Sequence, residues 1–233
     1  MGLGGNVVDE PRFRSRTRLF RDRCEAGRSL AGMLRGKIRG DALVLAIPSG
    51  GVPVGYCICQ ELGVPLDVVV VRKVPLPDNP EAGFGAVTLD GTLVLNEHLV
   101  AELGLSEHVI RAMAALRLRE IKERLEKFRA GREPADLSGK DLVLVDDGLA
   151  SGYTMLAAVR SIRKQSPKQV IVAVPTAHGE ALDVISPEVD MVYCLNIRFG
   201  PVFAVADAYV NWYDLNDEEV KDYLSKSWKR LAR

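Results

Sequence analysis

The sequence lacks the features that place a protein in a membrane or on a nucleic acid. Its 233 residues hold no apolar run near the length of about 18 that a membrane span requires. Residues 1–10 lack the basic start and the apolar core of a signal peptide. Lysine plus arginine (31) equals aspartate plus glutamate (31), so no net charge attracts a nucleic acid. We therefore expect a cytoplasmic protein with neither a membrane nor a nucleic-acid partner.

Cysteine is also scarce, with four residues at positions 24, 57, 59 and 194. None of them forms a CxxC pair or a spacing typical of metal ligands. We expect all four to be reduced thiols, with Cys57 and Cys59 buried as small apolar residues in a helix.

Several common catalytic signatures are missing. The chain has neither the GxxxxGK[ST] loop of P-loop nucleotide hydrolases nor the GxGxxG turn of dinucleotide sites. Ser49, Asp146 and His178 follow the chain order of some serine hydrolases, but the GxSxG turn is absent and Pro48 precedes the serine. Asp146 and Asp147 are adjacent, whereas phosphatases of the haloacid dehalogenase type need alternating acids. These classes are therefore disfavoured.

Apolar runs that alternate with helical patterns predict the fold. Continuous runs of Val, Ile, Leu and Ala predict buried strands at 42–47, 67–71, 142–145, 169–174 and 190–195. Periodic apolar positions predict helices at 15–39, 52–62, 106–130, 154–165 and 217–231. This order predicts an α/β fold with a doubly wound, mainly parallel five-stranded sheet flanked by helices. The length predicts a single domain over residues 1–233.

Other segments depart from this alternation. Residues 1–14 predict a loose tail, and residues 74–83, with three prolines, predict irregular structure. Asp90-Gly91 predicts a type I′ hairpin turn between residues 86–89 and 93–95. Interleaved acids predict that the arginines of the first helix form a solvated face rather than a nucleic-acid patch (Arg16, Arg18, Arg21, Arg23 and Arg28). The apolar stripe of 106–130 fits a homodimer interface and internal packing equally well.

Three loops carry the chemistry that the sequence suggests, because ligands gather at the carboxyl ends of parallel strands. The first, Pro48-Ser49-Gly50-Gly51, is a turn whose glycines let a ligand approach the backbone. The second is the cationic pair Arg72-Lys73. The third, residues 146–154, places two acids before a loop of small and hydroxyl residues that opens a helix, where anions bind well. Together they provide for two separated phosphates with a hydroxyl-rich or metal-bound centre between them.

The stretch Val143-Leu144-Val145-Asp146-Asp147-Gly148-Leu149-Ala150-Ser151-Gly152-Tyr153-Thr154 resembles a known motif. It is similar to the phosphoribosyl pyrophosphate (PRPP) motif of type I phosphoribosyltransferases, and most similar to the poorly characterised predicted phosphoribosyltransferases. The order of elements from about residue 40 to 212 resembles that family as well. The resemblance implies a core at 40–195, a mobile catalytic hairpin loop at 74–90, a small hood over the base at 196–212, and flanking helices at 1–39 and 213–233.

The resemblance also implies roles for the residues of the three loops. Asp146 and Asp147 would hold the ribose hydroxyls, partly through Mg²⁺, and would be catalytic together with Arg72 and Lys73. The 5′-phosphate would lie against the loop that contains Gly148, Ala150, Ser151, Gly152, Tyr153 and Thr154. Pyrophosphate would bind to Ser49, Gly50 and Gly51, a turn that often contains a non-proline cis peptide in this family, with its charge neutralised by Arg72 and Lys73.

The acceptor is expected in the hood. Aromatic residues gather there and could stack on a planar base (Phe199, Phe203, Tyr209 and Trp212). We name Phe203, Tyr209 and Thr176 as candidate base-binding residues, and we expect His178 to be solvated. Ala150 stands where the family's 6-oxopurine enzymes carry an aspartate, which argues against hypoxanthine or guanine. Expected partners are therefore PRPP and a nucleobase-like acceptor, or the nucleotide product. The alternative is a regulatory protein that binds PRPP or a nucleotide with little catalysis.

Overall fold

The computed structural model describes residues 4–38, 40–76 and 79–231. A parallel sheet of six strands forms its centre, in the order β1-β9-β8-β7-β2-β3. The strands are β1 (Val7–Asp9), β2 (Leu43–Ala46), β3 (Leu66–Val68), β7 (Asp141–Val145), β8 (Gln169–His178) and β9 (Met191–Arg198). The predicted parallel α/β architecture is confirmed, with one strand more than expected. The extra strand is β1, which pairs with β9 within the segment predicted as a loose tail.

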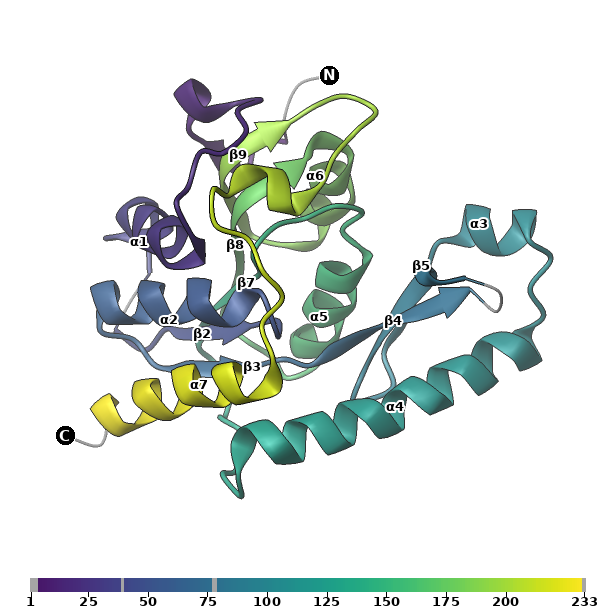
Figure 1. The fold of residues 1–233 in the computed structure, drawn as a ribbon. Coiled ribbons are helices and arrows are strands. Elements are labelled where there is room, and N and C mark those ends of the chain that lie inside the picture. The colour runs from purple at the N-terminus through teal and green to yellow at the C-terminus, as the bar shows by residue number, and fades with distance from the viewer. Residues whose placement is uncertain (1–3, 39, 77–78, 232–233) are drawn as a thin grey trace.

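Helices cover both faces of this sheet (Figure 1). One face carries α1 (Arg23–Leu34), α2 (Gly51–Leu62) and α7 (Asp217–Leu231), and the other carries α5 (Tyr153–Arg163) and α6 (Gly179–Ile185). Side chains of a strand alternate between the two cores: Val143 and Val145 face the first, and Leu142 and Leu144 face the second. Each central strand is therefore apolar on both sides, which explains its unbroken apolar run.

A second, antiparallel sheet projects from this body as an arm (Figure 1). Its strands are β4 (Val71–Leu76), β5 (Asn79–Thr88) and β6 (Leu93–Leu95). The helices that follow, α3 (Glu97–Glu102) and α4 (Glu107–Arg129), complete the arm. The prediction of irregular structure at 74–83 is wrong for the part of it that the structure describes. The ladder tolerates Pro75 because β4 is an edge strand and its register shifts at that proline.

Three predicted elements have different bounds or geometry. The run 67–71 is divided between β3 and β4, which belong to different sheets. The first helix begins only at Arg23, because Asp22 caps it and Ser15 and Arg18 have positive φ. The hairpin at Asp90-Gly91 exists, but only Gly91 has positive φ, so the turn is a three-residue loop with a left-handed third residue rather than type I′.

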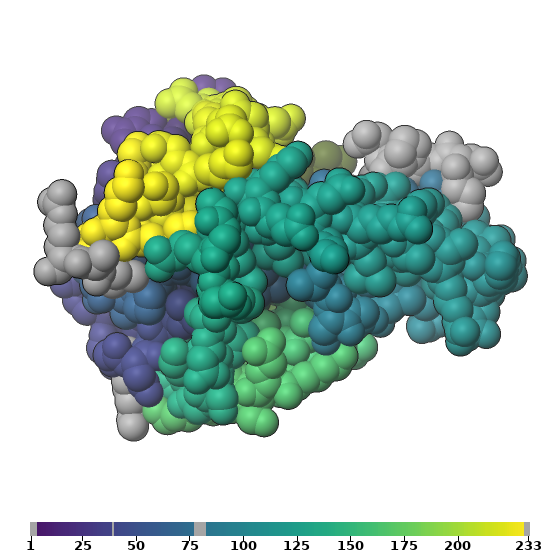
Figure 2. Space-filling view, turned by 90° about the horizontal axis from the view of Figure 1, so that it is seen from below, coloured from purple at the N-terminus to yellow at the C-terminus, as the bar shows by residue number. Residues whose placement is uncertain are grey.

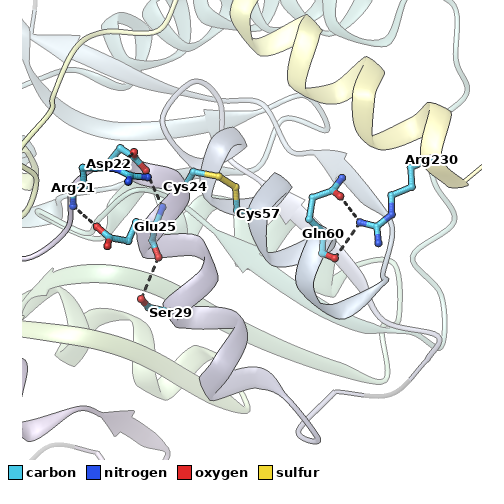
Figure 3. Close-up of a disulfide and its surroundings, with 8 residues drawn as sticks. All are labelled: Arg21, Asp22, Cys24, Glu25, Ser29, Cys57, Gln60 and Arg230. Atoms are coloured by element: carbon cyan, nitrogen blue, oxygen red, sulfur yellow. Dashed lines mark hydrogen bonds and ion pairs between the residues drawn. A yellow bond between two sulfur atoms is a disulfide. The ribbon is translucent and has the colours of Figure 1, made fainter.

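Cysteine pairing also differs from the prediction. Cys24 of α1 and Cys57 of α2 form a disulfide, with their Cα atoms 5.4 Å apart (Figure 3). Their helices pack side by side, which brings together two residues that lie 33 positions apart in the sequence. Cys59 and Cys194 are free and buried. The expectation of four reduced thiols is therefore wrong for Cys24 and Cys57.

The remaining short elements are three 3₁₀ turns, η1 (Pro11–Phe13), η2 (Ser186–Glu188) and η3 (Val205–Ala208). The last of these lies in the predicted hood. Among the helices that the structure describes, none is long and apolar enough to span a membrane.

Candidate functional site

The acid pair and the glycine turn leave neighbouring strands at the same edge of the central sheet. β2 and β7 pair in parallel, with Ala46 opposite Val145. A Cβ atom on Gly50 would overlap the carboxylate of Asp147, and one on Gly51 would lie 2.6 Å from the carbonyl oxygen of Val145. Both positions therefore require glycine for close approach. The Pro48–Ser49 peptide bond at the start of this turn is cis.

Burial dominates the electrostatics of the two acids. Oδ1 of Asp146 accepts a hydrogen bond of 2.8 Å from the backbone N–H of Asp147. Burial raises the pKa of Asp146 well above its ordinary value, and the nearby charge of Asp147 acts in the same direction. Burial also raises the pKa of Asp147, although Arg23 opposes that shift. The pair is thus held where a cation or hydroxyl donors would stabilise its charged form.

Arg23 of α1 is a site residue that the sequence analysis assigned to a solvated face. Its side chain is only 7% exposed, and its Nε donates to Oδ2 of Asp147 over 2.8 Å. Its Nη1 donates to the carbonyl of Tyr213, and its guanidinium lies 3.8 Å from the ring centroid of Trp212. No local pattern indicates these contacts, since Asp147 lies 124 positions further along the chain.

The loop between the acids and α5 is shaped as an open turn. Gly148 fits between Thr176 and Val205, whose side chains a Cβ there would meet at 2.9 and 2.6 Å. Ala150 and Ser151 are exposed, and Gly152 has a φ of +82° immediately before the helix. Because Gly152 has no side chain to cap α5, the N–H groups near Tyr153 and Thr154 are available to an anion.

The cationic pair lies in a different place from the one expected. Arg72 and Lys73 belong to β4 of the arm instead of the tip of a strand in the central sheet. Arg72 is half-buried and lies 3.5 Å from Glu120 of α4, whereas Lys73 is exposed. Burial lowers the pKa of Arg72, and the positive charge of Arg124 lowers it further.

Arg124 of α4 reaches the glycine turn, a contact that the sequence analysis missed. Its Nη2 donates to Oγ of Ser49 over 2.6 Å, and its Nε donates to Oδ1 of Asp217 at the start of α7 over 3.1 Å. The available signal was weak: Arg117 and Arg124 are seven positions apart and so share one face of the helix. Nothing in that spacing indicates which loop the face meets.

Two of the three predicted base-binding residues are buried in the protein interior. Tyr209 and Thr176 are 3% and 0% exposed, and their hydroxyls donate to the backbone oxygens of Asp147 and Asn196. Both lie in the interior, so neither offers a free ring face or hydroxyl to a base. Phe203 is half-buried, with its ring 5.5 Å from that of His178. His178 is not simply solvated, because its Nε2 lies 2.9 Å from the carbonyl of Gly200.

The other two hood aromatics differ from each other in role. Phe199 is 59% exposed, and a Cβ on Gly179 would lie only 2.4 Å from its ring. Trp212 is 36% exposed and carries Arg23 against its face. Phe203 and Phe199 are therefore the hood rings that lie at the surface without being committed to the acid pair.

Comparison with known proteins places these observations in context. A family described as the phosphoribosyl transferase domain matches residues 24–208. Two curated relatives, from the CDC 1551 and H37Rv strains of Mycobacterium tuberculosis, are provisionally named phosphoribosyl transferases. Each is 38% identical to this chain over 216 residues, which cover 92% of this chain and 48% of the relative. The chain thus spans about half the length of these relatives.

Solved structures show the same likeness. A crystal structure of a Thermus thermophilus protein is 36% identical, covers 89% of this chain and 98% of its own, and superposes with a TM-score of 0.74. A Neisseria gonorrhoeae protein crystallised with ppGpp is 17% identical, covers 91% of this chain and 97% of its own, and has a TM-score of 0.51. At that identity the second likeness shows the fold alone.

Proposed function

Because the chain belongs to the phosphoribosyl transferase family, we propose that it transfers the phosphoribosyl group of PRPP to a nitrogen base and releases pyrophosphate. The observation that carries this proposal is the contact between the acid pair and the Ser49–Gly51 turn, with the start of α5 beside them. In that arrangement two carboxylates, which can accept hydrogen bonds from hydroxyl groups, lie between two separate anion-binding turns. This matches the order of groups along PRPP, where the ribose lies between the 5′-phosphate and the diphosphate.

Each part of PRPP has proposed protein partners. Asp146 and Asp147 accept hydrogen bonds from the ribose hydroxyls. Backbone N–H groups of 150–154 bind the 5′-phosphate, with hydroxyls from Ser151 and Thr154. The turn Ser49–Gly51 binds the diphosphate, and Arg72 and Lys73 lie on the strand that begins the arm.

The proposed chemistry needs no covalent intermediate. A ring nitrogen of the acceptor attacks C1′ while the bond from C1′ to the diphosphate oxygen breaks, and the electron pair of that bond leaves with the diphosphate. Positive charge develops on the ribose in the transition state, where the half-buried carboxylates can stabilise it. Arginine side chains at the other end stabilise the charge that accumulates on the leaving group.

The donor set at the acid pair suits Mg²⁺ as part of the proposal. Mg²⁺ is commonly held by one or two carboxylates together with substrate phosphates and water. Among the described residues, no group of three or more His, Cys, Asp or Glu side chains could hold a metal alone, so the substrate would complete the site. Asp146 and Asp147 are the ligands available here, although Arg23 already contacts Oδ2 of Asp147. Bound Mg²⁺ would supply charge neutralisation for the diphosphate.

The arm is proposed to close over this site and exclude water. The mobile loop expected at 74–90 is formed by the end of β4, by β5 and by the two residues after it, and residues 77–78 lie outside the described residues. Phe203 remains the proposed stacking residue for the base. Tyr209 and Thr176 are buried and instead contact the loop after β7, at Asp147 and Gly148.

The test is pyrophosphate release from PRPP across a panel of purine and pyrimidine bases. We expect Asp146→Asn and Asp147→Asn each to lower kcat/KM about 10²-fold, on the order of 2.7 kcal/mol. Each variant removes a negative charge that would stabilise the positive charge developing on the ribose in the transition state. Asp183→Asn, at an exposed position of α6, serves as the matched control. Unchanged turnover in both site variants contradicts the assigned roles. Tight PRPP binding without release for any base would favour the regulatory alternative.

A further inference from the structure

Two arginines of the arm converge on one glutamate beside the proposed diphosphate turn. On α4, Oε1 of Glu120 lies 2.7 Å from Nη1 of Arg117, and its Oε2 lies 3.5 Å from Nε of Arg72 on β4. The three side chains are between 30% and 37% exposed, so water partly screens these ion pairs. Glu120 is therefore a single carboxylate that serves two guanidinium groups.

Arg124 joins this pair to the site. It lies one helical turn after Glu120, and its Nη2 bonds Oγ of Ser49 in the diphosphate turn. Its Nε bonds Asp217, which ties the start of α7 to the same point. Figure 2 shows the teal helix α4 crossing this side of the molecule next to the yellow C-terminal segment. Residues Arg117, Glu120 and Arg124 are thus presented by one helix toward β4 and the turn.

The cluster carries more positive charge than its acids can balance. Three guanidinium groups, from Arg72, Arg117 and Arg124, share two carboxylates, from Glu120 and Asp217. Within the described ranges, the Nε atoms of Arg72 and Arg117 are buried and form no hydrogen bond, and Nε of Arg72 has only its 3.5 Å ion pair with Glu120. Such unmet charged donors are costly, so the cluster is better satisfied by a stronger anion than by Glu120. Burial lowers the pKa of Arg72 most, and repulsion from the charges of Arg124 and Arg117 lowers it further.

We propose that Arg117 and Arg124, with Arg72, bind the diphosphate of PRPP, and that Glu120 holds Arg72 and Arg117 in place until the diphosphate displaces it. This inference rests on the proposed function and deepens it, because it assigns diphosphate recognition to the long helix of the arm. A diphosphate offers more acceptor oxygens and more negative charge than one carboxylate, and guanidinium groups match it in bidentate geometry.

The proposal makes Glu120 and the arginines act in opposite directions. Removing the charge of Glu120 frees two cations, so Glu120→Gln is expected to bind inorganic pyrophosphate and PRPP about 3- to 10-fold more tightly. Arg117→Gln and Arg124→Gln are each expected to weaken the binding of both by about 10- to 100-fold, the range for lost charge-assisted hydrogen bonds. Isothermal titration calorimetry with pyrophosphate alone measures this without requiring turnover.

Three controls separate this effect from misfolding and from general anion binding. Glu107→Gln removes an exposed member of another glutamate–arginine pair on α4 and is expected to bind as wild type. Ribose 5-phosphate lacks the diphosphate, so its affinity is expected to be unchanged in the Arg117 and Arg124 variants. Thermal unfolding and circular dichroism confirm that each variant folds, and Arg124→Lys, which retains charge without the fork, is expected to restore pyrophosphate binding in part.

Weaker pyrophosphate binding by Glu120→Gln would overturn the displacement step, because it would show that Glu120 orients the arginines for the ligand. Wild-type affinity in folded Arg117→Gln and Arg124→Gln would overturn the inference while the proposed function stands. Wild-type protein that binds neither PRPP nor pyrophosphate would overturn the proposed function and this inference with it.

Discussion

Arg23 makes Asp147 dependent on a residue of the first helix. Its guanidinium is buried between the carboxylate of Asp147 and the ring of Trp212. Removing one partner of such a pair leaves a buried charge without compensation. We therefore expect Arg23→Gln to lower the free energy of unfolding by about 3 kcal/mol, measured by urea denaturation, whereas exposed Arg28→Gln on the same helix changes it little.

A double-mutant cycle identifies the cause of that loss. With Arg23 already replaced, Asp147→Asn is expected to recover stability, because it removes the charge that has lost its partner. Additive losses in the double variant would show that Arg23 stabilises the protein through Trp212 and Tyr213 rather than through the acid.

Asp90 predicts a pH dependence of stability in the arm. Burial alone would raise its pKa, but hydrogen bonds from Thr88, Lys164, Thr92 and Ser161 outweigh burial and lower the pKa well below its ordinary value. A carboxyl whose pKa is lower in the folded state stabilises the fold above its unfolded pKa, and this contribution is lost as the pH falls toward the folded pKa. The contribution is therefore complete at neutral pH and is lost in strong acid.

We expect Asp90→Asn to reduce stability by about 1 kcal/mol at pH 7, since the group is partly exposed and screened. The difference between wild type and variant should narrow as the pH is lowered from 5 to 2, measured by urea denaturation at each pH. Effects of other acids, such as Asp22, are common to both proteins and cancel in this difference. A gap that is constant with pH would mean that the ionised carboxyl contributes nothing specific.

The disulfide between α1 and α2 gives a prediction for an element pair. It closes a loop of 33 positions, which restricts the unfolded chain by about 3–4 kcal/mol in the chain-entropy treatment. Burial raises the pKa of Cys194 to about 12 and also raises the pKa of Cys59, so both free thiols react poorly until the protein unfolds.

Thiol titration tests this pairing directly. Protein purified and denatured without reductant should show two reactive thiols, those of Cys59 and Cys194, and prior reduction should raise the number to four. Reduction, or Cys57→Ser, should also lower the melting temperature, whereas the matched Cys194→Ser leaves the disulfide intact. Four thiols without reductant would contradict the disulfide.

Elements with strong local patterns were predictable from the sequence. The run Leu142–Val145 predicted a buried strand, and the three- and four-residue spacing of 106–130 predicted α4 almost to its ends. The hairpin of β5 and β6 was also predicted from Asp90-Gly91, but β4 was not predictable, because Pro75 is tolerated only through an edge position and a register shift that tertiary structure supplies. Val7–Asp9 is too short to carry a pattern and becomes a strand only through pairing with β9.

The same limit applies to the site. Asp146, Asp147 and the Ser49–Gly51 turn could be paired from the sequence because parallel strands end at one edge. The contacts of Arg23 with Asp147 and of Arg124 with Ser49 span 124 and 75 positions and join separate elements. Such contacts depend on how helices pack on the sheet, which local periodicity does not specify. The buried Tyr209 shows the converse, since an aromatic residue in the hood segment serves packing instead of binding.

The molecule as a whole places its proposed ligand at a junction of several elements. Strands β2 and β7, helices α1, α5 and α7, and the arm all contribute residues around the acid pair and the glycine turn. A ligand that binds there contacts both the central sheet and the arm, and so it stabilises the folded chain over the unfolded one. The size of that effect follows from the ratio of the free ligand concentration to the dissociation constant.

PRPP at one hundred times its dissociation constant should stabilise the protein by about 2.7 kcal/mol. For a domain of this size, that corresponds to a rise in melting temperature of about 5–10 °C, measured by differential scanning calorimetry. The Asp146→Asn/Asp147→Asn double variant should show a much smaller rise at the same PRPP concentration, because it lacks the carboxylates that hold the ribose. An equal rise in the double variant would place PRPP elsewhere on the molecule and would separate ligand binding from the acid pair.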